Sequence, residues 1–323
     1  MKKFLIITLT ILIVALVGTG IYVYSLLNDM TRTSLADSTP EDLGISDSAP
    51  DEDDTGVINV LLFGLDRRNT NEKGSRSDAI MIATVDKKHK KLKLTSLMRD
   101  MYVSIPEKQD HKLNSAYAYG GPALAIKTVN TNFDLDIKRY ATIDFFGLEK
   151  VIDALGGVEI DVQDKEIKYL NIALNELNSI DESGNKSPHV QNGGLQTLDG
   201  KQAVAYCRIR YVGRDDFERT ERQRRVLSQM FQKVKDINVT DAPKLASSIL
   251  PYVETNMSNT EIITIGTSVL GFKDKNIYQY RIPVDGTYTG QTIKKMSVLV
   301  PDMPTNKNLL HEFIYESNGN MEE

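Results

Sequence analysis

Residues 4–27 contain no charged side chain, and this stretch of 24 residues constrains the chain more than any other feature of its sequence. As a helix it would extend about 36 Å, enough to cross a hydrocarbon core of about 30 Å. Lys2 and Lys3 precede the stretch, and acidic residues follow it. Because positively charged flanks stay in the cytoplasm, we expect a single-pass type II protein of the cell membrane. Residues 1–3 would be cytoplasmic, residues 4–27 a transmembrane anchor, and everything after residue 28 extracellular.

A cleaved signal peptide is the alternative interpretation of this stretch. Gly18 and Gly20 are small residues that suit a cleavage site. The apolar run nevertheless continues past them to Leu27, which is long for the core of a signal peptide, so a retained anchor is favoured. The single cysteine, Cys207, excludes an internal disulfide and Cys-rich zinc sites, and cysteine poverty fits an oxidising exterior.

The formal net charge of −5 is unevenly distributed along the chain. Residues 28–54 carry nine acids and one base, whereas the remaining chain is nearly neutral. Since this acidic segment is poor in large apolar residues, we expect residues 28–55 to form an unfolded extracellular linker. A nearly neutral folded part also argues against nucleic-acid binding.

Apolar runs of strand length alternate with helical patterns between residues 56 and 316. Strands are predicted over 57–63, 78–85, 91–97, 138–143, 158–162, 277–283 and 294–300. Helices are predicted from Asn114 to residue 132 and over 145–155, 198–207, 215–235, 241–253, 258–271 and 305–316. The polar residues 163–198 are expected to be a surface insertion. This order predicts an α/β fold, a three-layer α/β/α sandwich with a central mixed β-sheet, as one domain over 56–316 followed by a tail over 317–323.

Arginine is concentrated in one region, since seven of the 14 arginines lie between Arg208 and Arg225. The planar guanidinium group suits bidentate contact with phosphate oxygens. On the helix 215–235, Arg219 and Gln223 fall on the apolar face, whereas Arg222 lies at its edge. Arg224 and Arg225 point away and are expected to be solvated.

An arginine on a buried face needs an anionic partner, because burying it alone costs several kcal/mol. That partner is either an aspartate of the protein or a ligand phosphate, and the alternative is a solvated helix with surface salt bridges. Arg208 and Arg210, two residues apart, would project to one side of an extended segment.

Acidic residues lie at the ends of the first predicted strands. Asp66 follows the strand that ends at Gly64, Asp78 opens the next strand, and Arg99 and Asp100 end the third. Ligand sites of α/β proteins commonly form at such an edge. Two aspartates with substrate phosphates are ligands that Mg²⁺ prefers, so the pattern indicates phosphoryl transfer. Taken singly, each aspartate also fits a turn cap or an arginine partner.

Five motifs occur in order: NVLLFGLD at 59–66, RSD at 76–78, LMRD at 97–100, KLNSAYAYGG at 112–121, and AYCRIRYVGRDDFERTERQ at 205–223. Each is weak alone, but the ordered set closely resembles the LytR-CpsA-Psr family of cell-wall glycopolymer transferases. The resemblance implies an apolar tunnel that binds a polyprenyl diphosphate. It also implies transfer of a phospho-glycopolymer, such as wall teichoic acid, to peptidoglycan, with polyprenyl phosphate leaving.

The resemblance further implies roles for individual residues. Asp66 and Asp78 would hold Mg²⁺ or Mn²⁺, Arg99 and Asp78 would be catalytic, and Asn114 would order the site. The diphosphate would be bound by Arg76, Arg99, Arg208, Arg210, Arg219, Arg222 and Gln223. Arg214 and the general base stay unassigned. The implied partners are the lipid-linked glycopolymer, peptidoglycan and the cytoplasmic membrane. A polyprenyl-diphosphate hydrolase and a non-catalytic cell-envelope regulator or binding module are the open alternatives.

Overall fold

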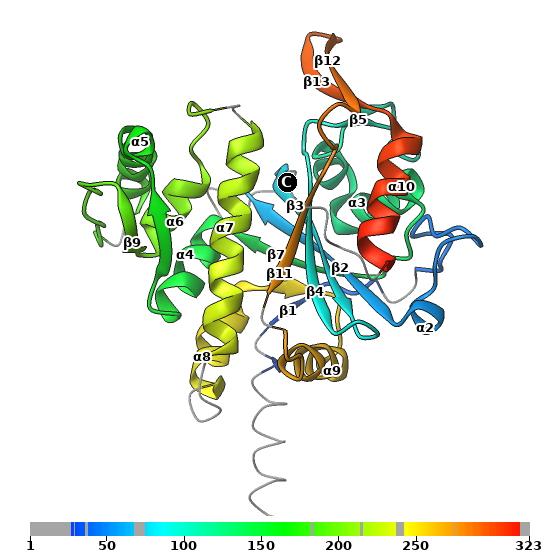
Figure 1. The fold of residues 1–323 in the computed structure, drawn as a ribbon, viewed down its shortest axis with the longest axis horizontal. Helices are drawn as coiled ribbons and strands as arrows, with labels where there is room; N and C mark the ends of the chain where they lie inside the picture. The colour runs from blue at the N-terminus through cyan, green and yellow to red at the C-terminus, as the bar shows by residue number, and fades with distance from the viewer. Residues whose placement is uncertain are drawn as a thin grey trace, which may run out of the picture.

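The computed structural model describes residues 27–28, 30–35, 38–67, 75–181, 184–213, 216–236, 242–274 and 276–316. A mixed sheet of seven strands lies at its centre, in the order β1-β10-β7-β2-β3-β4-β11 (Figure 1). Strand β2 pairs antiparallel with β3 and parallel with β7, which confirms the predicted mixed sheet. The bounds are β1 (Thr31–Arg32), β2 (Val57–Leu65), β3 (Ser77–Asp86), β4 (Lys91–Leu97), β7 (Arg139–Asp144), β10 (Glu254–Thr255) and β11 (Ile277–Ile282).

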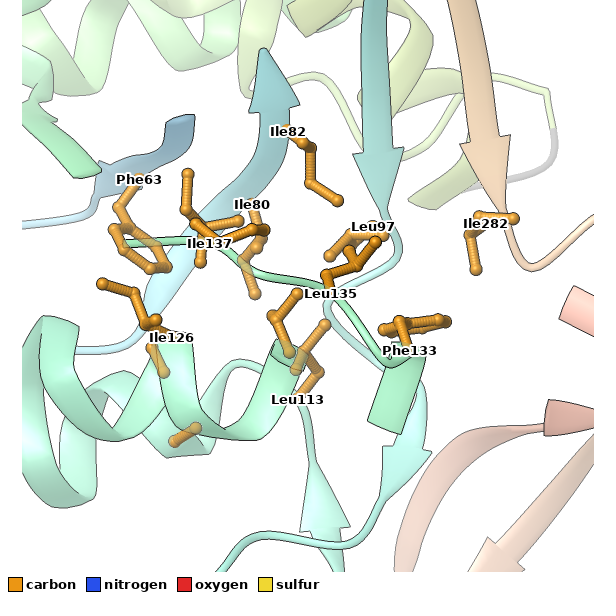
Figure 2. Close-up of a cluster of buried hydrophobic side chains, with 14 of the residues drawn as sticks. Phe63, Ile80, Ile82, Leu97, Leu113, Ile126, Phe133, Leu135, Ile137 and Ile282 are labelled. Atoms are coloured by element: carbon orange, nitrogen blue, oxygen red, sulfur yellow. The ribbon is translucent and has the colours of Figure 1, made fainter. Parts of the chain in front are cut away.

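Strand β2 explains why helices cover both faces of the sheet. Its side chains are apolar at nearly every position and alternate between the faces. Phe63 and its neighbours at every second position pack with α3 (Ser115–Phe133) and α10 (Met303–Tyr315). Figure 2 shows this cluster, in which Phe63, Ile80 and Leu97 lie toward Ile126 and Phe133. Ile58 and Val60 face α7 (Asp216–Lys235) and α9 (Asn259–Leu270) on the other side.

A second core lies outside the sheet and packs against α7. It is built from α4 (Phe145–Ala154), β8 (Val158–Val162), α5 (Asp164–Ile180), β9 (Gly194–Leu198) and α6 (Gly200–Cys207). The expectation of a surface insertion at 163–198 is therefore wrong for α5 and β9. Within its polar surroundings, α5 buries three leucines at helical spacing, Leu170, Leu174 and Leu177. This periodicity in the sequence would have predicted the helix.

The C-terminal part contains one strand that the sequence pattern did not reveal. Strand β12 (Tyr288–Ile293) pairs with β13 (Met296–Pro301) in a hairpin that projects from the body (Figure 1). The predicted helix at 241–253 is α8 (Ala242–Ile249) with a 3₁₀ turn, η1 (Leu250–Tyr252). Two short strands, β5 (Tyr102–Val103) and β6 (His111–Lys112), pair with each other.

The described part of the acidic segment folds onto the domain, so the expected unfolded linker is wrong there. Leu43 is buried in the main cluster, and its carbonyl oxygen accepts a hydrogen bond from Asn130 Nδ2 at 2.9 Å. The short helix α2 (Glu52–Thr55) is held by Arg139, whose Nη1 lies 2.7 Å from Glu52 Oε2. The segment is too polar to fold alone, but the domain supplies the apolar surface that it lacks.

Within the described ranges, no helix is both long and apolar enough to cross a membrane. Residues 4–26 of the expected anchor lie outside these ranges, and so does the expected tail 317–323.

Leu43→Ala should destabilise the domain by about 2–4 kcal/mol, because the substitution leaves a cavity in the main core. Thermal unfolding measures the effect, and Asp47→Ala, an exposed position four residues away, is the matched control. Equal melting temperatures for the two variants would show that the acidic segment does not pack on the domain.

Candidate active site

Three strand ends bring the predicted carboxylates and one arginine to one edge of the sheet. Asp66 follows β2, Asp78 lies at the start of β3, and Arg99 follows β4. Leu65 pairs with Ser77 while Gly64 pairs with Ala79, so Asp78 is the extra residue of a bulge. Side chains along β3 alternate between the two faces of the sheet. The bulge interrupts this alternation at Asp78 and so redirects its side chain.

Two aspartates hold three arginines at this edge. Asp78 pairs with Arg99, and its Oδ2 lies 3.3 Å from Arg210 Nη2. Asp216, at the start of α7, places its Oδ1 2.7 Å from Arg219 Nη2 and 3.3 Å from Arg99 Nη2. Arg99 thus bridges the two carboxylates. Arg99 Nε also lies 3.8 Å from Asp100 Oδ2, and Asp100 pairs with Lys112 at 2.7 Å. Four cations therefore share three carboxylates, and the network keeps an excess of positive charge.

Arg219 is the most deeply buried member of the network, with only 2% of its side chain exposed. Burial lowers the pKa of its guanidinium to about 10, against the opposing effect of Asp216. Among the described residues, its Nε and Nη1 have no hydrogen-bond partner. Buried donors without partners are costly, so this side chain is suited to an anion with several oxygens.

Arg99 differs from Arg219 in its electrostatic surroundings. Burial opposes its charged form, but Asp78, Asp216 and Asp100 together raise its pKa. Its backbone is fixed as well, because Asn114 N donates to Arg99 O at 3.1 Å. Asn114 is itself buried at the start of α3. It therefore lies where it can order the strand end that carries Arg99.

An apolar cavity of about 310 Å³ begins next to this network, between the sheet and helices α4 and α7. The α7 residues that line it run from Gln223 to Val234, about 16 Å along the helix. Gln223 lies one turn from Arg219, so the charged network stands beside one end of the cavity. The other lining residues include Leu62, Gly64, Ala79, Met81, Ala141, Phe145, Leu148, Val151, Cys207, Ile249 and Val253.

Arg208 and Arg76 are predicted phosphate ligands that lie outside the two-aspartate network. The Nη2 atom of Arg208 lies 3.3 Å from Glu176 Oε1, and its guanidinium lies 5.4 Å from the ring of Phe145, which lines the cavity. Arg76 is exposed just before β3, and Asp66 is half-buried just after β2. Arg214 lies outside the described residues.

Arg222 is fully buried and has a protein partner. Its Nε lies 2.7 Å from Glu166 Oε1 on α5, and its Nη1 donates to Ile209 O at 3.3 Å. These contacts fix the segment that carries Arg210. The structure thus gives Arg222 a positioning contact, whereas it places Arg99, Arg210 and Arg219 around the aspartates.

The expectation that Arg224 is solvated is wrong, because it is buried and its Nε donates to Gln279 Oε1 at 3.2 Å. Helix α7 packs against the sheet as well as the second core, so its apolar face is wider than the sequence pattern indicated. Arg225 is exposed as expected and pairs with Glu221.

Asp216 is the site residue that sequence reasoning did not single out. Its position three residues before Arg219, in the first turn of a helix, is the signal that would have identified it. Its Oδ2 is buried and lacks a hydrogen-bond partner within the described part of the chain.

An arginine-rich edge beside an apolar cavity is an arrangement suited to an amphiphilic anion. The LytR_cpsA_psr family matches residues 18–312, and the chain belongs to this family. Regulatory protein MsrR of Staphylococcus aureus is 32% identical over 265 residues, which cover 81% of this chain and 75% of that protein. Polyisoprenyl-teichoic acid–peptidoglycan teichoic acid transferase TagU of Enterococcus faecalis is 33% identical over 262 residues, or 77% of this chain and 76% of that protein.

Solved structures of TagT from Bacillus subtilis share the fold. The structure with bound octaprenyl pyrophosphate lipid is 27% identical, with a TM-score of 0.62, and the match covers 87% of this chain and 99% of that one. The structure of TagT bound to LI-WTA has a TM-score of 0.66 at the same identity and coverage.

Arg222→Ala should destabilise the domain by about 3–5 kcal/mol, because it leaves the buried Glu166 carboxylate without its cation. Arg225→Ala, on the same helix, should cost no more than about 1 kcal/mol, since its ion pair with Glu221 is partly exposed to solvent. Denaturant unfolding monitored by circular dichroism measures both. Similar losses would contradict the positioning contact assigned to Arg222.

Proposed function

We propose that this chain is an extracellular phosphotransferase that moves a phospho-glycopolymer, such as wall teichoic acid, from a polyprenyl diphosphate to peptidoglycan. One observation carries the proposal: the buried Arg219, two of whose donors have no partner among the described residues, stands beside an apolar cavity. A diphosphate bound at the arginines would place its prenyl chain in the cavity. The names of TagU and of the lipid-bound TagT structure support the same class of substrate.

The proposed reaction follows from this placement. A hydroxyl of peptidoglycan attacks the phosphorus next to the sugar, an oxygen–phosphorus bond forms, and the bond to the bridging oxygen breaks. Polyprenyl phosphate leaves with the electron pair. Arg99, Arg210 and Arg219 offset the negative charge on the diphosphate, and alignment of the hydroxyl supplies much of the remaining rate enhancement. The base that takes the hydroxyl proton is unassigned.

Asp66 and Asp78 are the residues proposed to hold Mg²⁺ or Mn²⁺. The described residues contain no group of three or more metal-ligating side chains, so an ion here would need substrate phosphates as additional ligands. The carboxylate oxygens fit this arrangement, because a bound diphosphate would attract the arginines and so release Asp78. The buried Oδ2 of Asp216 is a further oxygen ligand nearby. When bound, the ion would neutralise charge that develops on the leaving phosphate.

Residues 4–27 are proposed to anchor the chain as a single-pass type II membrane protein, with the domain outside the cell. The uncharged stretch and the two lysines before it support this orientation. Peptidoglycan, the proposed acceptor, lies on that side.

Arg219→Ala should weaken binding of a labelled polyprenyl diphosphate about ten- to a hundredfold, because a charge-assisted contact to phosphate contributes roughly 1.5–3 kcal/mol. Arg225→Ala, on the same helix, should change the affinity little, since its exposed pair contributes near zero. Fluorescence anisotropy compares the two. Equal affinities would mean that Arg219 does not contact the lipid diphosphate.

Asp66→Ala should abolish transfer, while its thermal unfolding stays near that of the wild type. Excess EDTA should likewise abolish transfer by the wild-type protein. Chromatography of the products distinguishes polymer joined to peptidoglycan from polymer released by hydrolysis. The exposed Asp110→Ala is the control for loss of one acidic charge. Full activity of Asp66→Ala would remove Asp66 from the proposed metal site, and release of free polymer alone would favour the hydrolase.

A further inference from the structure

Helix α9 has an exposed face that is unusual for a surface helix. Residues 262–272 contain no charged side chain. The exposed residues of α9 are three threonines together with Ile263 and Leu270, and Leu270 has 63% of its surface in solvent. A helix whose outer face is uncharged and carries two exposed large apolar side chains is suited to a second apolar surrounding.

Two hydroxyl groups on this helix have partners within the helix itself. Thr267 Oγ1 donates to Ile263 O at 2.8 Å, and Ser268 Oγ donates to Thr264 O at 2.8 Å. Because these two hydroxyl groups are satisfied within the helix, moving them out of water costs less than moving an unpaired hydroxyl.

The uncharged stretch 4–27 ends at the same place. Asn28, the next residue, accepts a hydrogen bond from Asn259 Nδ2, the first residue of α9, at 2.9 Å. Arg32 contacts both Asn259 and the carbonyl oxygen of Leu27. A membrane entered by residues 4–27 would therefore lie against α9.

The far end of the cavity opens toward the same end of the molecule. Val234 lines the cavity and is 40% exposed at the end of α7, and Tyr252 of η1 is 43% exposed beside the lining residue Val253. Figure 1 shows α8, α9 and β1 together at the lower end of the molecule, opposite the β12–β13 hairpin.

We propose that the outer face of α9, with Val234 and Tyr252, is a membrane-contacting surface that rests on the lipid bilayer around the far end of the cavity. This inference rests on the proposed membrane anchor. At 12 residues, α9 is too short to span a bilayer and would lie in its interface, about 5–10 Å deep. A prenyl chain longer than the cavity would then pass from Val234 directly into hydrocarbon.

The test uses the full-length chain in nanodiscs that hold one copy each. Single cysteines replace Ile263 or Leu270 on α9 and carry a polarity-sensitive fluorophore. Ile172→Cys on α5 and Leu195→Cys on β9 are matched controls, because both positions are also exposed and apolar but lie on the second core. The native Cys207 is buried, and burial raises the pKa of its thiol, so the label is directed to the exposed positions.

The fluorophore on α9 should emit at shorter wavelength than the controls and lose most of its intensity when the discs contain a lipid-borne quencher. Emission and quenching equal to the controls would overturn the inference while leaving the anchor and the transferase proposal intact. A shift without lipid quenching would also overturn it, because protein rather than lipid would cover the helix. Failure of the chain to enter discs would overturn the anchor, and this inference with it.

Discussion

The sharing of Asp78 and Asp216 among three arginines is the interaction on which the site depends. Three guanidinium groups would repel one another at this edge of the sheet, and burial makes their charge more costly. Asp78, Asp216 and the neighbouring Asp100 make the arrangement possible, and with Lys112 the cations still outnumber these carboxylates. Burial lowers the pKa of Arg219, and two of its buried donors lack partners in the described structure. The site is therefore preorganised for an added anion.

Helix α7 joins the two halves of the site. Its first turns carry Asp216 and Arg219, and the following turns present Gln223 and the apolar side chains that line the cavity. A ligand that fits both parts must have an anionic head and a long apolar chain. The buried pair of Arg222 with Glu166 fixes the helix to α5, so the geometry of the head site also depends on the second core.

Much of the fold could be predicted from local patterns. Strand β2 is a continuous apolar run bounded by turn signals, and α7 shows Arg219 in line with Val226 and Met230, both of which are buried. The position of Asp78 and Arg99 at neighbouring strand ends followed from the order of the strands. These features depend on short stretches of chain, where periodicity and polarity determine the structure.

Features that depend on distant partners could not be predicted in the same way. Arg224 is buried because β11 supplies Gln279, and Arg222 is paired because α5 supplies Glu166. The acidic segment packs because the core accepts Leu43, although its composition is typical of a linker. In each case the deciding contact joins residues far apart in sequence. A helical wheel shows the residues of one segment only, so it cannot predict such a contact.

Mass spectrometry of lipid that co-purifies with the full-length protein in mild detergent tests the central claim most directly. The wild-type protein should retain a polyprenyl phosphate or diphosphate, and Arg219→Ala should retain much less at equal yield. Binding of ordinary phospholipids alone, or equal retention of polyprenyl lipid by both proteins, would contradict the claim that the arginines beside the cavity hold a lipid diphosphate.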